Sequence, residues 1–321
     1  MTTAPHAAPQ GVAVEFVAAD GYPLKGRHWA VANDDARRPA VVLCAATGVA
    51  ARYYGRYAAW LASHGMPVLT FDYRGIGASR YGSLRGLRAT KHDWGALDTD
   101  AAIRQLAALY PQRTRVGVGH SIGGFCLGLA PSNALLSRLL LVGSQYAYWP
   151  DYAPAHRFGY FMRWHVLMPL LAATLGYFPG KRLGWLEDLP RGVALEWGLR
   201  LWPEFDRLYR WLPGAPGEHD GSTARAAFAA FPGDVLACAA ADDPYATPAA
   251  MQRLLDWFST AKTHRVQFLP ARFGLTEIGH FAPFHSDMQH TLWPLSLRWL
   301  RGRDARLPGD RTVSGCVCQA V

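Results

Sequence analysis

Cysteine is scarce and irregularly spaced in this chain of 321 residues. The five cysteines form no regular set, which excludes a disulfide framework of the kind that stabilises small secreted domains. Cys44, Cys126 and Cys238 lie inside apolar runs and are predicted to be buried thiols. Cys316 and Cys318 have no histidine or further cysteine beside them, so we expect no metal site there. We expect neither a metal ion nor an organic cofactor elsewhere in the chain.

A targeting signal is also lacking. The first ten residues have neither the basic start nor the apolar core of a secretory signal peptide. We therefore expect a cytoplasmic location, with disordered ends over residues 1–11 and 302–321.

Lysine is rare, at four residues against 29 arginines, and the formal net charge is +9. An excess of positive charge can indicate nucleic acid or an anionic surface as the partner. Here the arginines are scattered along the chain, and no nucleic-acid-binding motif accompanies them. We therefore expect no nucleic-acid partner.

Long apolar runs are nearly absent, with one exception at residues 158–178. This stretch contains Arg163, His165 and Pro169, and an arginine near the centre of a spanning helix costs about 2.5–3.5 kcal/mol on insertion scales. The sequence therefore predicts no integral membrane span. A lid that packs on the core, or that contacts lipid at an interface, fits the stretch better.

Short apolar runs alternate with segments of helical spacing, in a chain of which half the residues are hydrophobic. A wholly apolar run of four to six residues is typical of a parallel strand covered on both faces. The first two expected strands differ, because apolar and polar residues alternate along them. Asp20-Gly21 marks a turn between them, so this pair is predicted to form an antiparallel hairpin. The pattern predicts the α/β class, with a mostly parallel, doubly wound sheet. The expected strands are 12–17, 24–29, 40–45, 67–71, 116–119, 139–142, 235–240 and 266–269, and the expected helices are 53–64, 94–109, 125–130, 248–258 and 291–300.

The alternation stops between residues 149 and 232. Aromatic, helix-like segments punctuated by prolines replace it, and we expect no short buried strand there. A structureless loop of this length is uncommon within a compact domain. We therefore expect a core over 12–148 and 233–301, interrupted by a helical insertion over 149–232.

One short motif dominates the chemistry, Gly119-His120-Ser121-Ile122-Gly123-Gly124. It follows an apolar strand and precedes a helix, and glycine on both sides of a serine permits a very tight turn. Such a turn exposes the serine hydroxyl and directs the first amides of the helix toward it. Ser121 is therefore the candidate nucleophile. His120, beside it, points to the wrong face of the turn to be its base and is expected to pack or hydrogen-bond nearby.

A serine nucleophile needs a base to take its proton and an acid to orient that base. Asp242 and Asp243 follow a late strand, and successive residues of an extended segment point to opposite sides, so one of the two can face the histidine. His280 lies in the loop before the last helix, with His285 as the reserve candidate. The order serine, acid, histidine matches the order expected for a nucleophile on a strand-to-helix turn.

Two backbone amides are needed to bind the oxyanion of a tetrahedral intermediate. The first is expected from Ile122, directly after the serine. The second is expected from the loop 46–49, and Val49, which follows Gly48, is our choice. We place Gly48 and His120 beside the substrate.

These motifs together resemble the α/β-hydrolase superfamily: Ser121 in its glycine-rich turn, the run Asp-Tyr-Arg-Gly-Ile-Gly-Ala-Ser at 72–79, Asp243-Pro244, and Gly279-His280-Phe281. The chain is similar, over about residues 12–301, to the monoglyceride-lipase and serine-aminopeptidase-like group, and most of all to bacterial predicted hydrolases without an assigned substrate. The resemblance implies the α/β-hydrolase fold with a helical cap, and its Asp-Pro turn favours Asp243 over Asp242. Many relatives have His-Gly where this chain has Thr47-Gly48.

The resulting hypothesis is a serine hydrolase with Ser121, His280 and Asp243 as its triad, acting on a small or medium apolar carboxylic ester. A basic loop after the fourth strand would favour a carboxylate or phosphate on the substrate if it borders the pocket. An acyltransferase or amidase on the same triad, and a non-catalytic binding protein on this fold, are the alternatives. The oligomeric state is left open. The basic residues of the loop after the fourth strand, which would favour such a substrate, are Arg74, Arg80, Arg85, Arg88, Lys91 and His92.

Overall fold

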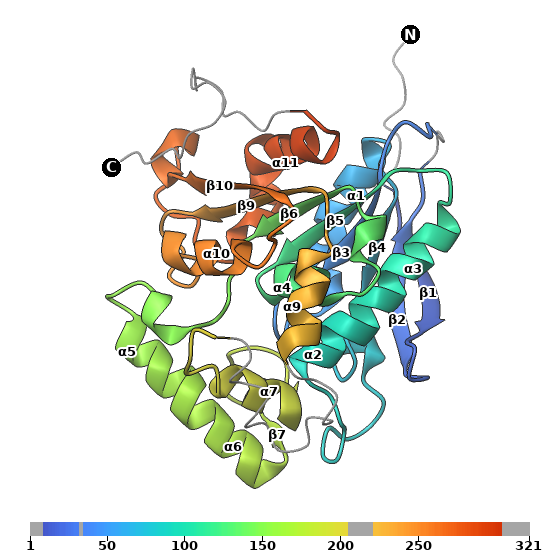
Figure 1. Cartoon of the computed structure of the whole chain (residues 1–321). Helices are drawn as coiled ribbons and strands as arrows, with labels where there is room; N and C mark the ends of the chain where they lie inside the picture. The colour runs from blue at the N-terminus through green and yellow to red at the C-terminus, as the bar shows by residue number, and fades with distance from the viewer. Residues whose placement is uncertain (1–8, 32–34, 205–220, 304–321) are drawn as a thin grey trace.

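One eight-stranded sheet runs through the molecule, with helices on both of its faces (Figure 1). The computed structural model describes residues 9–31, 35–204 and 221–303. The first two strands pair antiparallel, the second also pairs antiparallel with β4, and every other pairing is parallel. This confirms the predicted mostly parallel sheet. In spatial order the strands are β1 (Val12–Val17), β2 (Pro23–Trp29), β4 (Val68–Phe71), β3 (Ala40–Cys44), β5 (Arg115–His120), β6 (Arg138–Val142), β9 (Asp234–Ala240) and β10 (Lys262–Phe268).

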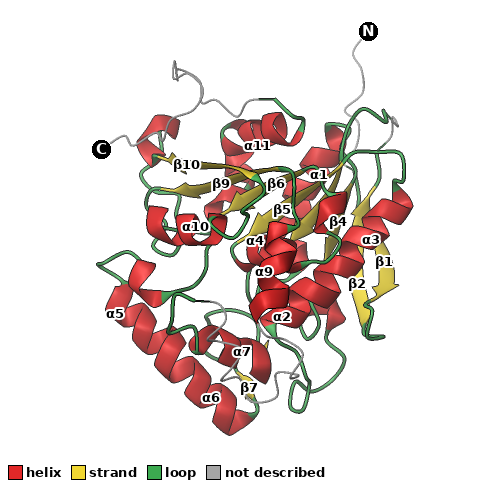
Figure 2. Cartoon of the chain, viewed as in Figure 1, coloured by secondary structure: helices red, strands yellow, loops and turns green. Residues whose placement is uncertain are grey.

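The strands in the middle of the sheet are buried along almost their whole length, because helices cover both faces (Figures 1 and 2). α1 (Gly55–Ser63) and α11 (Leu292–Leu300) lie on one face, where the rings of Tyr57 and Trp293 meet at 5.2 Å. The other face carries α3 (Asp100–Leu109), α4 (Ile122–Leu129) and α10 (Pro248–Leu255). The predicted strands and helices of the core are therefore confirmed, with ends that move by up to six residues.

The segment between β6 and β9 leaves the sheet and lies below it in the view of Figure 1. Its longest element is a continuous helical stretch: α5 (Arg157–Tyr160), a π-helical part (Phe161–Leu167) and α6 (Met168–Leu175). Our expectation of no buried strand here is wrong, because β7 (Tyr177–Phe178) and β8 (Leu189–Pro190) form a small antiparallel pair in which Phe178 and Leu189 are fully buried.

The structure describes two further helices in this segment. α7 (Arg191–Gly198) packs against α6 and against the short helix α2 (Lys91–Asp93). α9 (Gly221–Ala229) packs on core helix α4, where Phe228 and Phe125 meet at 5.6 Å. Residues 205–220 of the predicted insertion lie outside the described residues.

The apolar stretch 158–178 forms a helix that leaves large apolar side chains in solvent. Within the described residues, no helix has both the length and the apolar character that crossing a bilayer requires. Exposed apolar side chains occur at every fourth residue and form a stripe along this helix. Phe158, at one end of the stripe, is 76% exposed, and Leu170, at the other end, is 57% exposed. The members of this apolar stripe are Phe158, Met162, Val166 and Leu170.

Predictions for the two ends of the chain fall largely outside the structure. The described residues exclude 1–8 and 304–321, and therefore Cys316 and Cys318. The other three cysteines, Cys44, Cys126 and Cys238, are buried free thiols, as predicted.

Candidate active site

Ser121 occupies a strained turn between β5 and α4. Its φ of 53° and ψ of −117° make it the one non-glycine residue with positive φ in the described part of the chain. A backbone in this region costs about 1–3 kcal/mol and persists only where the surrounding structure holds it. The Ser121 N–H donates to the carbonyl of Val142 at 3.0 Å, which fixes the turn to the end of β6.

The glycines that flank Ser121 are required by close backbone approach. A Cβ on Gly119 would lie 2.4 Å from the nitrogen of Gly124, and a Cβ on Gly123 would lie 2.3 Å from the carbonyl oxygen of Cys44. Neither contact is possible for a real side chain, and neither neighbour can move, because both are backbone atoms. The turn predicted from the Gly-x-Ser-x-Gly spacing is therefore present.

His280 and Asp243 form a buried pair. The ring Nδ1 of His280 lies 2.7 Å from Oδ2 of Asp243, and the two residues are 8% and 4% exposed. The pair adjoins the end of β6, because a Cβ on Gly143 would lie 3.1 Å from Nδ1 of His280. Gly143 directly follows Val142, which binds the Ser121 amide, so the structure brings the three predicted residues to one place.

Asp242 and Asp243 have separate tasks. Asp243, and not Asp242, contacts His280, and its second oxygen accepts the N–H groups of Tyr245 and Ala246 at 2.9 and 3.0 Å. Asp242 faces the other way and accepts the N–H groups of Ile278 and Gly279 at 2.8 and 3.1 Å. Asp242 therefore holds the loop that carries His280.

The carboxyl of Asp243 is held in its charged form. Burial alone raises the pKa of Asp243, but the charge and hydrogen bond of His280, with the N–H groups of Ala246 and Tyr245, outweigh burial and leave the pKa below its ordinary value of 3.8. An ionised Asp243 accepts a hydrogen bond from Nδ1–H of His280, which leaves Nε2 of the ring free to accept a proton.

The predicted oxyanion donors have different surroundings. The N–H of Ile122 is the first of α4 and so has no acceptor within that helix. Val49 does not fit the prediction, because its N–H already donates to the carbonyl of Ala46 at 3.2 Å. In the same loop, the N–H groups of Thr47 and Gly48 have no hydrogen-bond acceptor among the described residues. They replace Val49 as the candidate donors.

Comparison with known proteins agrees with this geometry. The serine aminopeptidase S33 family matches residues 35–179, a stretch that includes Ser121. Together with the sheet and the Ser121 turn, this match and the solved structures show that the chain has the α/β-hydrolase fold.

Solved structures of low sequence identity share the α/β-hydrolase fold. An esterase domain from Rhodothermus marinus is 17% identical, with 91% of this chain and 98% of that chain covered and a TM-score of 0.55. An esterase of Pyrococcus furiosus is 14% identical, with 92% and 91% covered and a TM-score of 0.55. An acylaminoacyl peptidase of Pyrococcus horikoshii is 12% identical, with 93% and 41% covered and a TM-score of 0.55. No curated protein sequence matches the chain.

His120 packs and hydrogen-bonds inside the core, as one of our two expectations for it stated, and its burial does not fit the other, a place beside the substrate. It is fully buried, with Nδ1 2.8 Å from the hydroxyl of Tyr54 and Nε2 3.0 Å from the carbonyl of His280. A carbonyl can only accept, so Nε2 carries the proton and Tyr54 donates to Nδ1. The Tyr54 oxygen in turn accepts the Ala46 N–H at 2.9 Å. His120 therefore connects the predicted oxyanion loop to the His280 loop, and burial lowers its pKa to about 3.

The segment between β6 and β9 touches both sides of the site. On one side the carbonyl of Gly48 accepts the N–H of Glu187 at 2.9 Å, and Leu186 covers the Cα of Gly48. Gly48 can therefore meet a substrate only through its N–H. On the other side, the ring of Tyr245 lies 5.1 Å from that of His280 and stacks on Tyr160 at 4.4 Å.

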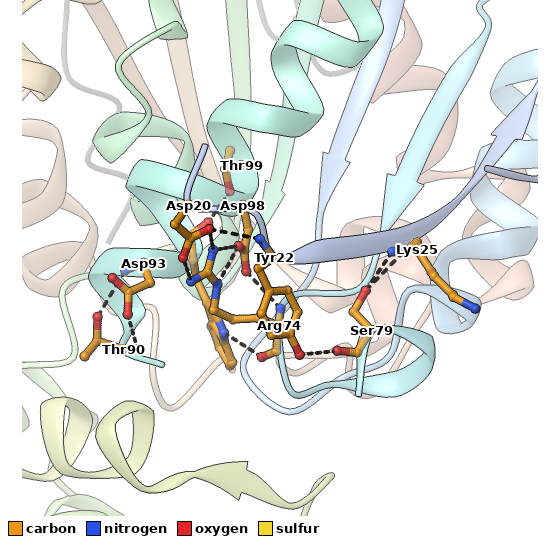
Figure 3. Close-up of polar contacts among 10 residues, drawn as sticks. Asp20, Tyr22, Lys25, Arg74, Ser79, Thr90, Asp93, Asp98 and Thr99 are labelled. Carbon is orange, nitrogen blue, oxygen red and sulfur yellow. Dashed lines mark hydrogen bonds and ion pairs between the residues drawn. The ribbon is translucent and has the colours of Figure 1, made fainter. Parts of the chain in front are cut away.

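The basic loop after β4 does not form a charged mouth. Arg74 is 3% exposed and binds Asp98 and Asp20 at 2.7 and 2.6 Å, as Figure 3 shows. Lys91 and His92 are also buried, at 1% and 6% exposure. These three basic side chains are therefore not solvated.

Three residues around the triad escaped the sequence analysis: Tyr54, Tyr245 and, in its holding role, Asp242. Tyr245 had a signal, because it lies two residues after Asp243. Tyr54 had none, because only folding brings it to His120, 66 residues away. Among the described residues, no group of three or more His, Cys, Asp or Glu side chains is arranged to hold a metal ion.

Proposed function

We propose that this protein is a serine hydrolase in which Ser121 is the nucleophile. His280 Nε2 takes the proton of the Ser121 hydroxyl as its oxygen attacks the substrate carbonyl. Asp243 fixes the ring tautomer and stabilises the imidazolium that forms. The N–H of Ile122, with those of Thr47 and Gly48, would bind the oxyanion. His280 then gives the proton to the leaving group, and water releases the acyl group by the same route.

The buried Asp243–His280 pair beside the strained Ser121 turn is the observation that carries this proposal. A solvated or merely structural histidine has no need of a buried carboxylate whose other oxygen is held by two backbone amides. Nor does a structural serine explain a backbone conformation that costs energy and that glycine would adopt more easily. His285, the reserve base, is exposed and packs edge-on against Tyr53.

A carboxylic ester with an apolar acyl group is the substrate class we propose. Aromatic side chains from the segment between β6 and β9 support it, since Tyr160 and Trp164 surround Tyr245 beside His280. Two of the solved structures that share the fold are described as esterases. We propose that this segment acts as a cap over the site. The apolar stripe on α5 and α6 supports contact with a lipid surface, and the cytoplasmic location stays a prediction.

Amide hydrolysis or acyl transfer on the same triad is the alternative. The match to the serine aminopeptidase S33 family and the likeness to an acylaminoacyl peptidase favour its amidase form. Turnover of 4-nitrophenyl butyrate against that of alanine 4-nitroanilide would separate the two. Ester turnover alone supports the esterase, and faster anilide turnover supports the amidase.

A fluorophosphonate probe tests the nucleophile directly. We expect one adduct, on the peptide that contains Ser121, and a loss of labelling and of ester turnover in Ser121→Ala. His280→Ala should lose both as well, whereas its matched control His285→Ala should keep both. We expect Asp243→Asn to lose about 10⁴-fold in kcat, because the amide favours the wrong tautomer.

Folding controls make a negative result informative. Circular dichroism and thermal unfolding should match the wild type for every variant. Failure of the folded wild type to label, with detergent present to open a cap, would overturn the proposal and favour a non-catalytic binding protein.

A further inference from the structure

Lys91 is a buried basic residue in the short helix α2. It is 1% exposed, and its ammonium makes no hydrogen bond or ion pair with any residue that the structure describes. Its ammonium lies over the ring of Trp197 on α7, with 4.2 Å between Nζ and the ring centroid. Burial and the nearby Arg200 lower the pKa of Lys91 well below its ordinary value of 10.5.

Three more polar atoms around Lys91 are buried without a hydrogen bond among the described residues: the hydroxyl of Tyr152, Nε2 of His165 and Nε1 of Trp197. Each of the four residues interacts with the next one, and the last, His165, interacts with Lys91. Lys91 lies over Trp197, whose indole N–H faces the Tyr152 hydroxyl and lowers its pKa. The rings of Tyr152 and His165 lie 6.3 Å apart, and the charge of Lys91 acts on His165. Three separate elements thus bring buried polar atoms near Lys91, and two of these atoms, the Trp197 indole N–H and the Tyr152 hydroxyl, face each other.

The nearest carboxylate is committed elsewhere. Glu196 attracts Lys91 through space, but its two oxygens bind Nη2 of Arg200 at 3.0 Å and the N–H of His92 at 3.1 Å. Nδ1 of His165 is likewise used, since it donates to the carbonyl of Gly198 at 2.9 Å. The groups that remain are therefore Nζ of Lys91, the hydroxyl, the indole N–H and Nε2.

A buried ammonium without an anion is costly, as is each buried polar group without a hydrogen bond. A methionine of similar length would avoid the cost of the charge. A bound small anion would remove this cost, because the anion would accept hydrogen bonds from Lys91, Trp197 and Tyr152 together. His165, with a pKa of about 4, keeps Nε2 unprotonated, so that this nitrogen can accept a hydrogen bond from the ammonium of Lys91.

This cluster lies one layer of aromatic rings away from the candidate active site. The ring of Tyr245 lies 5.7 Å from Tyr152 and 5.1 Å from His280. Trp164, whose indole N–H donates to the Tyr245 hydroxyl at 3.3 Å, stacks on Trp197 at 4.8 Å. Aromatic side chains therefore separate Lys91 from His280.

We propose that Lys91, Tyr152, His165 and Trp197 form a subsite for a carboxylate, so that the substrate is an ester whose acyl chain ends in a carboxylate. One ammonium with neutral donors matches a singly charged group better than a doubly charged phosphate. The subsite itself follows from these contacts, whereas its use in ester hydrolysis rests on the function proposed above.

Binding is measured on Ser121→Ala, which cannot turn over the ligand. The probes for calorimetry are monomethyl glutarate, its neutral analogue dimethyl glutarate, and inorganic phosphate. We expect the monoanion to bind and Lys91→Met to weaken it about 10- to 100-fold. Tyr152→Phe and Trp197→Phe, which each remove one donor, should weaken it less. Lys262→Met, which removes an exposed lysine, should bind as Ser121→Ala does.

Three results would overturn the subsite. They are equal binding of the monoanion by the Lys91→Met variant, equal binding of the neutral diester, and preference for phosphate. Loss of binding counts only if Lys91→Met unfolds at the same temperature as the wild type or higher, which is expected because the substitution removes an unpaired buried charge.

Kinetics then test the link to catalysis. The substrates are 4-nitrophenyl half-esters of succinate, glutarate and adipate, each against the neutral ester of equal chain length. We expect kcat/KM to favour one half-ester by about tenfold or more, and Lys91→Met to abolish the preference while keeping neutral-ester turnover. Hydrolysis of both kinds without Lys91 dependence would overturn the subsite and keep the function. Lys91-dependent binding without any hydrolysis would keep the subsite and overturn the function.

Discussion

Two cations from the same basic loop, Arg74 and Lys91, are buried to nearly the same degree and in opposite circumstances. Arg74 is 3% exposed and makes side-chain contacts with two aspartates, Asp20 and Asp98. Lys91 is 1% exposed and has no carboxylate partner among the described residues. The first charge is neutralised within the chain, so its role is structural. The second charge is left for a ligand to neutralise.

The chemistry of the two side chains matches this difference. A guanidinium presents several fixed donors and is always charged, which suits a permanent buried pair. The guanidinium of Arg74 donates to both Asp98 and Asp20, and the backbone N–H of Arg74 also donates to Asp98 at 2.8 Å (Figure 3). An ammonium is a compact charge on a flexible stem, and burial shifts its pKa more readily. Lys91 can therefore adjust to the presence or absence of an anion.

Breaking the Arg74 pair should have the largest effect. We expect Arg74→Met to lower the free energy of unfolding by about 3–5 kcal/mol, because it leaves Asp98 buried without a countercharge. Urea denaturation would measure the loss. The double variant Arg74→Met/Asp98→Asn should recover part of it. A single variant as stable as the wild type would mean that this buried pair is not structural.

The pH dependence of Lys91→Met should show a smaller effect. Because the pKa of Lys91 is lowered in the folded state, the unfolded chain binds the proton more tightly just below pH 10.4. Wild-type stability should therefore rise with pH in that window, by at most about 1.4 kcal/mol per pH unit relative to Lys91→Met. Parallel curves for the two proteins, from denaturation at pH 8 to 10, would contradict a pKa of Lys91 that burial lowers.

The smallest effect is expected at Arg80, a more exposed cation of the same loop. Its Nη1 binds Asp188 at 3.0 Å and ties the loop to the segment between β6 and β9. Partly exposed pairs contribute little, so we expect Arg80→Met to change the free energy of unfolding by less than about 1 kcal/mol. A loss above 2 kcal/mol in the same denaturation assay would show that this contact holds the segment in place.

Most of the core could be predicted from the sequence, because buried parallel strands are continuous apolar runs and helices have their own spacing. The turn at Ser121 was visible for a similar reason, since the backbone approach to Gly119 and Gly123 leaves room for no other residue. Two site predictions failed, one because of a local contact and one because of contacts between residues distant in the sequence. Val49 donates within its own turn, and His120 is held by Tyr54 and by the carbonyl of His280.

The sequence by itself determined the sheet, the strained serine turn, and the order of Ser121, the acid and His280, because apolar spacing and glycine are local signals. Only the tertiary structure decided between Asp242 and Asp243, since they differ in the direction in which a folded loop points them. It also decided which basic side chains are paired. Arg74 and Lys91 look alike in the sequence, and burial against aspartates or against aromatic rings separates them, because a buried charge depends on neighbours that are distant along the chain.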